Sequence, residues 1–274
     1  MAAGILALPC LLEVFLFLIA LAHAWTNEEC TTCHPDVAER YAASRHAHAF
    51  DNANFVAVWR HADQRRWCAS CHLPQGDPMG CDSCHQGHEP VATDVCQGCH
   101  TVPSPNLHPP LRFGGEPLQT TWDEWARVTT KPCAGCHLDG HRFPGGHDAD
   151  QVRRALTVET APGRLTLRTT DEVGHRVPTG DPFRRLEVAL CATEACETIR
   201  VRRVLAVVHQ PDAEGWLQVE KDTRLGPPGS PWPDAVSLED PKAGGYRVRL
   251  LLADPALALP REERILDLFQ GALP

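Results

Sequence analysis

Positive charge, methionine and tyrosine are scarce in this chain. Its 274 residues carry 26 Lys and Arg against 35 Asp and Glu, which gives a formal net charge of −9 at pH 7. No basic face is expected from this balance, which argues against nucleic acid as a partner. Methionine and tyrosine number two each. The apolar run Leu11–Ala22 is short for a membrane span, so the sequence gives no strong transmembrane signal.

Cysteine, in contrast, is abundant and patterned. Ten of the thirteen cysteines form five Cys-x-x-Cys-His motifs. Two cysteines at this spacing can form thioethers to one haem and the next histidine can bind its iron, so each motif predicts a c-type haem attachment site. The sequence therefore predicts five covalently attached haem c groups. The attachment cysteines are Cys30, Cys33, Cys68, Cys71, Cys81, Cys84, Cys96, Cys99, Cys133 and Cys136, and the proximal iron ligands are His34, His72, His85, His100 and His137.

Zinc binding and a disulfide framework are the alternative interpretations of these cysteines. Zinc ribbons use two Cys-x-x-Cys pairs per metal and need no histidine directly after each pair. Here every pair is followed by histidine, and five pairs do not divide into four-ligand sites. A disulfide framework also leaves the histidines unexplained. The pattern therefore favours haem attachment.

The N-terminus indicates export. The run Leu11–Ala22 ends at Ala22-His23-Ala24, which has the small-x-small form of a signal-peptidase site. We predict a signal peptide over 1–24, a mature chain from Trp25 and a periplasmic location, which agrees with haem attachment outside the bacterial cytoplasmic membrane. No Lys or Arg precedes the run and Glu13 interrupts it, so an uncleaved membrane anchor is the alternative.

The mature chain divides near residue 150. Residues 25–150 hold all five motifs, about 25 residues for each haem, which is too few for an ordinary apolar core. We expect the porphyrins themselves to form the core of this pentahaem domain, with short helices and loops around them. Helices are predicted over Asp36–Ala43, Asn52–Arg66 and Thr121–Val128, with Thr120 or Thr121 as a cap of the last.

Residues 151–274 are predicted to form a small antiparallel β domain, sandwich-like, so that the whole chain is α+β. A proline-rich loop interrupts it at Gly226–Asp234, and a short helix is expected at Arg261–Phe269. A disulfide between Cys191 and Cys196 is predicted for an exported protein, two unpaired thiols flanking a hairpin being the alternative. The strand-like runs are Arg164–Thr169, Arg185–Leu190, Ile199–Val208, Trp216–Val219 and Tyr246–Leu252.

The distal iron ligands are expected to be histidines. Nine histidines of the mature chain lie outside the motifs, whereas Met79 is its one methionine, so a low-potential bis-His set is favoured over Met ligation. We predict distal ligands among His46, His88, His141, His147 and His175, with His61 and His108 as less favoured candidates.

Local sequence separates some of these histidines. His88 follows His85 too closely to reach the far side of the same haem, so it should serve a neighbouring one. His46 and His48 are separated by one residue, so one of the two is expected to bind, and His209 lies in a strand-like run where a structural role is expected.

A repeated segment links the two domains. His141 and His175 each begin a His-Arg-x-Pro-x-Gly segment, and proline and glycine let a chain approach a flat haem face closely. We therefore predict that the β domain caps the haem cluster and supplies His175 as a ligand. Two similar turns with surface histidines are the alternative.

Several segments resemble the cytochrome c554-like multihaem family, which is related to the octahaem hydroxylamine-oxidoreductase and nitrite-reductase assemblies. They are Ser44-Arg-His46-Ala, Cys81-Asp-Ser-Cys-His85 with His88 following, and Trp122 and Trp125 ahead of Cys133-Ala-Gly-Cys-His137. The resemblance implies that His46 and His88 are distal ligands, although Gln86-Gly87 departs from the usual Gly-Pro-Gly.

The segments around His141 and His175 look like those of extended multihaem cytochromes with a C-terminal β domain. They read His-x-Phe-Pro-Gly-Gly-His and Gly-His-x-x-Pro-Thr-Gly. The resemblance covers roughly residues 28–180 and says little about the remainder.

Two functions remain open. An electron carrier would pass electrons between a quinol-oxidising membrane complex and a terminal reductase or other redox protein, alone or within a cytochrome assembly or at a membrane. A reductase of a small nitrogen or sulfur oxyanion would need one haem with an open face. The nitrite reductases of the related group use a Cys-x-x-Cys-Lys site, which is absent here, and neither Tyr41 nor Tyr246 lies in a motif that suggests a catalytic cross-link. The surplus of histidines also favours the carrier.

Overall fold

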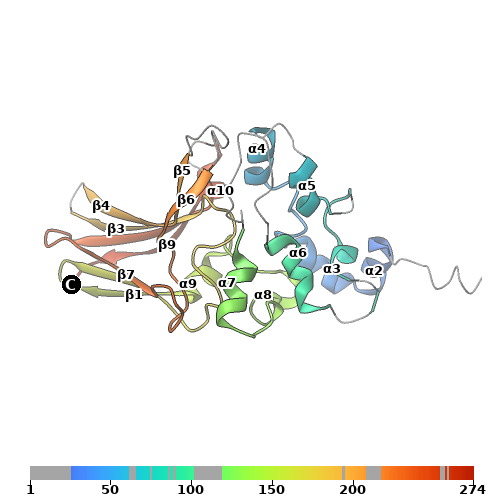
Figure 1. Ribbon diagram of the computed structural model, residues 1–274, viewed down its shortest axis with the longest axis horizontal. Helices are drawn as coiled ribbons and strands as arrows, with labels where there is room; N and C mark the ends of the chain where they lie inside the picture. Colours follow the sequence, from blue (N-terminus) through green and yellow to red (C-terminus); the bar gives the residue numbers. More distant parts are fainter. Residues whose placement is uncertain are drawn as a thin grey trace, which may run out of the picture.

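The computed structural model describes residues 26–61, 66–74, 76–85, 87–88, 91–101, 119–192, 195–207, 217–253, 257 and 259–274. The predicted signal peptide over 1–24, His108 and His209 lie outside these residues, as does the side chain of His61. Helices dominate the N-terminal half and antiparallel strands the C-terminal half, so the predicted α+β class is confirmed (Figure 1). Among the described residues, no helix has the length and apolar character needed to cross a membrane.

Each Cys-x-x-Cys-His motif lies on or beside one short helical turn. Residues three apart share a face of a helix, so this geometry presents both cysteines of a motif on one side. The helical elements before residue 150 are α2 (Asn27–Cys33), α3 (Pro35–Ala42), α4 (Ala53–His61), α5 (Arg66–His72), the 3-10 turns η1 (Cys81–Ser83) and η2 (Thr93–Cys96), α6 (Gln97–His100), α7 (Thr121–Val128), α8 (Ala134–His137) and η3 (Asp139–His141).

The start signals of these helices are visible in the sequence. Thr26 and Glu29 form a capping box that begins α2, and Pro35 occupies the first turn of α3. The predicted helix over Thr121–Val128 is α7. Thr120 does precede α7, but its hydroxyl donates to the Glu124 carboxylate at 2.6 Å instead of capping the helix.

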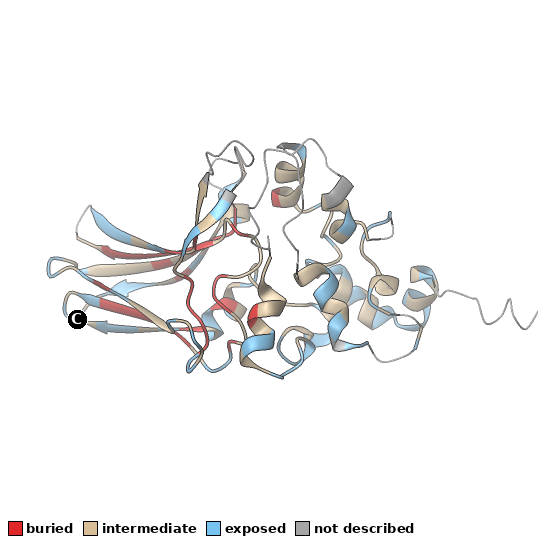
Figure 2. Cartoon of the chain, viewed as in Figure 1, coloured by how far each residue is buried: buried red, intermediate tan, exposed pale blue. Residues whose placement is uncertain are grey.

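The helical half has little conventional core among its described residues. The buried residues before 150 are Ser44, Asn54 and Glu124, all of them polar, whereas the buried hydrophobic side chains begin at Val152 (Figure 2). This distribution is expected if bound haems, and not apolar side chains, fill the interior of the helical half. The haem-packed core itself stays a prediction.

The described residues of the C-terminal half form three antiparallel sheets. α9 (Ala149–Arg154) leads into it, and one cluster of buried side chains from β1, β2 and β7 and from β3, β8 and β9 lies between the two larger sheets. The first sheet has the order β1 (Leu156–Ala161), β2 (Arg164–Thr169), β7 (Ala235–Glu239); the second β4 (Cys196–Val201), β3 (Arg185–Cys191), β8 (Gly245–Leu251), β9 (Ile265–Ala272); and the third pairs β5 (Arg203–Val207) with β6 (Leu217–Asp222).

Two sequence predictions in this half are wrong. Arg261–Phe269 is not one helix: α10 (Arg261–Arg264) is a single turn, and the chain then extends as β9 because it pairs with β8. Ile199–Val208 is not one strand, since the chain leaves β4 at Val201 and starts β5 in another sheet. At the break, the N–H of Arg202 donates to the Thr223 hydroxyl at 3.0 Å, outside either ladder.

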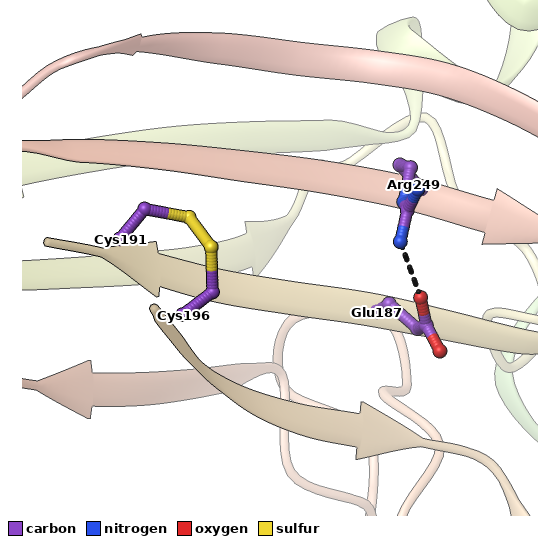
Figure 3. Close-up of a disulfide and its surroundings, with 4 residues drawn as sticks. All are labelled: Glu187, Cys191, Cys196 and Arg249. Carbon is purple, nitrogen blue, oxygen red and sulfur yellow. Dashed lines mark hydrogen bonds and ion pairs between the residues drawn. A yellow bond between two sulfur atoms is a disulfide. The ribbon is translucent and has the colours of Figure 1, made fainter. Parts of the chain in front are cut away.

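A disulfide closes the hairpin of β3 and β4. Cys191 and Cys196 are cross-strand partners with an S–S distance of 2.10 Å (Figure 3). Farther along the same hairpin the buried Glu187 of β3 accepts a hydrogen bond from Arg249 of β8 at 2.9 Å, so these two strands are also joined by an ion pair.

Removing the disulfide should weaken the β domain. With a sequence separation of 5, the loop entropy lost from the unfolded chain is worth about 2 kcal/mol, so Cys191→Ser with Cys196→Ser should lower the free energy of unfolding by about that amount. Urea denaturation followed by circular dichroism measures it, with an unchanged haem spectrum as the control. An unchanged denaturation midpoint would contradict a stabilising role.

Candidate haem-binding sites

Among the described residues, four pairs of histidine rings have nearly the same distance between their ring centroids. Each pair joins the histidine of a Cys-x-x-Cys-His motif to a histidine from elsewhere in the chain. The ring centroids are 6.2 Å apart for His34 and His88, 6.1 Å for His46 and His100, 6.2 Å for His85 and His141, and 6.1 Å for His137 and His175.

This spacing fits one metal ion between two rings. A metal–imidazole bond of about 2.0 Å and a ring radius of about 1.1 Å put the centroids of two trans imidazoles about 6.2 Å apart. Direct ring stacking would be closer, and unrelated side chains would not repeat one distance four times. The residues present therefore fit haem iron with two axial histidines.

Hydrogen bonds leave Nε2 as the free nitrogen in two of the paired rings and in His72, the histidine of the second motif. Nδ1 of His137 lies 2.7 Å from the carbonyl of Pro144, Nδ1 of His72 2.5 Å from that of Ala49, and Nδ1 of His175 3.0 Å from that of Arg176. A carbonyl can only accept, so each Nδ1 must carry the proton. The lone pair of Nε2 is then available to a metal.

Burial keeps several of these imidazoles neutral. It lowers the pKa of His100 to about 4, to which the neighbouring His46 and His137 contribute. Burial is also the largest cause of the lowered pKa of His46 and of His175. Only a neutral imidazole offers a lone pair to iron, so the environment favours the ligating form at pH 7.

The turn that carries His141 is unusual in its backbone. Asp139, His141 and Phe143 have φ angles of 20°, 75° and 49°, the left-handed region that non-glycine residues rarely adopt. Nε of Arg40 donates to the carbonyl of Gly140 at 2.9 Å and holds the turn against α3. Such backbone strain collects at functional sites, and here it brings His141 to His85.

The second motif has different surroundings. The ring of His72 stacks on Phe55, with centroids 3.6 Å apart and planes 11° apart. In the part of the chain that the structure describes, no histidine ring faces His72 at the spacing of the other four pairs. The candidates His61 and His108 are not tested, because the side chain of one and the whole of the other lie outside the described residues.

Two other histidines have different partners. His48 has both ring nitrogens engaged, with Nδ1 3.2 Å from the Asp51 carboxylate and Nε2 3.0 Å from the carbonyl of Ala42. Nε2 of the predicted candidate His147 accepts a hydrogen bond from Arg184 at 3.0 Å. Burial and the charge of Arg184 lower the pKa of His147 to about 3. This geometry does not support His147 as a ligand.

The motifs contact one another through their thiols. The Cys81 thiol hydrogen-bonds to Cys30, and Cys96 to Cys133. Burial, with the neighbouring Cys133 and Cys84, raises the pKa of Cys96 to about 11.

Cys71 of the second motif joins the fourth motif. A hydrogen bond between Cys71 and Cys99 lowers the pKa of Cys71 and raises that of Cys99. The motifs therefore run first, third, fourth and fifth in space, with the second beside the fourth.

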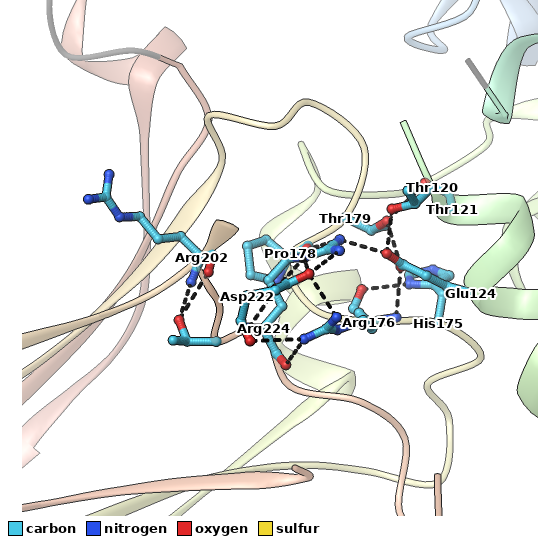
Figure 4. Close-up of polar contacts among 11 residues, drawn as sticks. Thr120, Thr121, Glu124, His175, Arg176, Pro178, Thr179, Arg202, Asp222 and Arg224 are labelled. Atoms are coloured by element: carbon cyan, nitrogen blue, oxygen red, sulfur yellow. Dashed lines mark hydrogen bonds and ion pairs between the residues drawn. The ribbon is translucent and has the colours of Figure 1, made fainter. Parts of the chain in front are cut away.

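The β half delivers His175 to the helical half. The loop that carries His175 packs in space between α7 and the segment that follows β6. A network of buried charges surrounds this loop (Figure 4). Glu124 of α7 and Arg224 form its central ion pair at 2.7 Å. The two halves of the protein therefore meet at the loop that carries a candidate iron ligand.

The fold is one found among multihaem cytochromes. The chain is similar to the solved structure of a penta-heme cytochrome c552 from Thermochromatium tepidum, with a TM-score of 0.64 and 18% sequence identity over 92% of this chain and 99% of that chain. At this identity the likeness shows a shared fold. No protein-family model and no curated protein matches the sequence. The resemblance to the cytochrome c554-like family stays a prediction.

Sequence reasoning missed the residues that support these histidines. Phe55 and Phe143 pack on candidate ligand rings, and Glu124 and Arg224 are buried charges. The Trp122–Trp125 segment drew attention to α7, but nothing in it distinguishes the buried Glu124 from the neighbouring Asp123.

Proposed function

We propose that this chain is an exported pentahaem c-type cytochrome that passes electrons between redox partners. The observation that carries the proposal is the set of four histidine pairs with centroids 6.1–6.2 Å apart, each containing one motif histidine. When bound, the haems supply reversible one-electron redox chemistry. The protein supplies attachment, axial ligands and a surrounding that excludes other ligands.

The ten motif cysteines would hold five haems through thioether bonds. We assign the axial pairs as His34 with His88, His46 with His100, His85 with His141, and His137 with His175. With haem bound, these pairs of imidazoles would hold the iron on both sides, which would leave no face for a substrate at those four sites. This closure favours a carrier over a reductase.

Contacts between the motifs support a continuous electron path. Cysteines of the first and third, fourth and fifth, and second and fourth motifs interact in pairs, and Cys84 of the third motif lies close enough to Cys96 of the fourth to raise its pKa. Centres attached at these positions would be neighbours, and the second motif would branch from the fourth. A branched arrangement gives separate entry and exit points for two redox partners.

The second motif is where a reductase would reside. His72 stacks on Phe55 instead of facing a described histidine, which sets this site apart from the other four. If neither His61 nor His108 completes it, one open face would remain for a small nitrogen or sulfur oxyanion. This second candidate function rests on that one difference.

The partners and the location are part of the proposal. Residues 25–150 have nine Lys and Arg against sixteen Asp and Glu, so a partner with a basic docking patch would be complementary. A quinol-oxidising membrane complex as donor and a terminal reductase as acceptor fit a periplasmic carrier. The chain would have the same carrier role if an N-terminal anchor held it at the membrane or if it were part of a larger cytochrome assembly.

A reductive titration of the purified holoprotein tests the function. The protein should contain five haems, accept five electrons per chain and return them to an oxidant, and loss of Cys30 and Cys33 to serine should remove one haem. Nitrite, hydroxylamine and sulfite should not be turned over. Sustained turnover of any of them at a haem of this chain would contradict the carrier role.

A further inference from the structure

We propose that Glu124 of α7 is the positioning residue that fixes His175 opposite His137. The inference rests on the proposed function, because it takes His175 as an iron ligand. His137 is the histidine of the fifth motif, whereas His175 belongs to the β half. The site is therefore complete only when the two halves are held in a fixed position relative to each other. Glu124 makes that connection from the helical side (Figure 4).

The Glu124 carboxylate is buried and fully engaged. Glu124 is 4% exposed, and its Oε2 accepts from the N–H of Arg176 and from the Thr179 hydroxyl, both at 3.1 Å. Its Oε1 accepts from the Thr120 hydroxyl at 2.6 Å and from Nη1 of Arg224 at 2.7 Å. One carboxylate thus binds the residue directly after His175 and the residue four positions after it.

The other side of the loop is fixed by the β half. The Arg176 guanidinium donates to Asp222 at 2.7 Å and to the carbonyl of Arg224 at 3.0 Å. Val177 and Leu225 form an antiparallel bridge with N–O distances of 2.7 and 3.0 Å. The loop that carries His175 is therefore clamped between α7 and residues 222–225.

Close packing of α7 supports the same conclusion. A side chain at Gly174 would meet the Thr129 methyl group at 3.3 Å and the Trp125 ring at 3.7 Å, so the residue before His175 lies directly against α7 and the segment that follows it. Small movements of α7 would reach the imidazole through both Gly174 and Arg176. The ring itself has no hydrogen bond to Glu124, and its Nδ1 bonds to the Arg176 carbonyl.

Glutamine cannot replace this carboxylate. Two of the four groups that face Glu124 can only donate: the N–H of Arg176 at Oε2 and the guanidinium of Arg224 at Oε1. An ionised carboxylate offers an acceptor to both. In Glu124→Gln the amide NH2 would oppose one of these two donors in either orientation, and a buried Arg224 that lost Glu124 would keep Asp222 and a contact of 3.4 Å to the carbonyl of Pro178. The loop should relax there and His175 should detach from the iron for part of the time.

The test compares Glu124→Gln, Thr179→Val and the control Glu172→Gln in the holoprotein. Glu172 is an exposed carboxylate three residues before His175 and outside the clamp. The readouts are low-spin haem by electron paramagnetic resonance and carbon monoxide bound per chain after reduction. Glu124→Gln should lose low-spin haem and bind more carbon monoxide than the wild type, by up to one per chain. Thr179→Val should show a smaller change of the same kind, and Glu172→Gln none.

A double variant separates positioning from general destabilisation. In a His175→Ala background the ligand is already gone, so Glu124→Gln should cause no further loss of low-spin haem. Additive loss, or wild-type spectra in both Glu124→Gln and Thr179→Val, would overturn the inference. If Glu124→Gln does not accumulate, Thr179→Val decides alone. If His175→Ala itself leaves every haem low-spin, the ligand assignment in the proposed function fails instead.

Discussion

Replacing His175 with alanine is expected to convert one haem in five from low spin to high spin. The rings of His175 and His137 are nearly parallel, with planes 10° apart and centroids separated by 6.1 Å, a distance that fits two ligands of one iron. With alanine at this position, His137 alone would hold the iron, and water or carbon monoxide could take the vacated position. Electron paramagnetic resonance of the oxidised protein and the absorption change with carbon monoxide after reduction measure the effect.

His48→Ala is the matched control for that substitution. His48 lies two residues from the proposed ligand His46, but both of its nitrogens already have protein partners. Its loss should leave every haem low-spin. A wild-type spectrum in His175→Ala would show that the β half does not supply a ligand.

Replacing Arg224 with leucine should destabilise the protein strongly. Arg224 is 5% exposed and pairs with Glu124 at 2.7 Å and Asp222 at 2.8 Å. Burial alone would lower the pKa of Arg224, but its hydrogen bond to Asp222 and the charge of Glu124 raise it overall. Removing one partner of a buried ion pair leaves the other uncompensated, which costs about 3–5 kcal/mol. Denaturant unfolding followed by circular dichroism measures the loss.

Arg168→Leu provides the comparison at the surface. Arg168 also pairs with a carboxylate, Asp234 at 3.0 Å, but these side chains are 41% and 37% exposed. Exposed pairs contribute about 0–1 kcal/mol, so the change should be small. If the two variants lose equal stability, the buried network does not hold the two halves together in the way described.

The sequence alone is enough to propose the haem attachment sites because their chemistry is local. A Cys-x-x-Cys-His motif contains the whole covalent site within five residues, and its helical turn follows from the same spacing. The helix over Thr121–Val128 and the strand over Arg164–Thr169 also follow from local patterns, and both predictions agree with the structure.

Ligand pairing required the tertiary fold. The sequence indicated His46, His88, His141 and His175, but not which motif histidine each would meet. The His85–His141 pair depends on a left-handed turn held by Arg40, which no residue pattern announces. His147, six residues after His141, was also a candidate, yet its Nε2 accepts a hydrogen bond from Arg184.

The wrong predictions also trace to long-range pairing. Arg261–Phe269 has residues that suit a helix, but β8 offers an open edge and the chain extends along it. β1 and β7 were missed because neither run is strongly apolar, and their pairing with β2 stabilises them. Glu124 was missed because burial of its charge depends on donors from three parts of the fold: Thr120 beside α7, the loop that carries His175, and Arg224.

Spin quantitation of the oxidised holoprotein by electron paramagnetic resonance tests the central claim most directly. Four histidine pairs at 6.1–6.2 Å predict at least four low-spin bis-His irons per chain, and the state of the fifth iron would depend on what faces His72. Four or five low-spin irons is the predicted result, and a single high-spin iron would locate an open face at the second motif. Fewer than four low-spin irons would contradict the pairing and, with it, the proposed carrier.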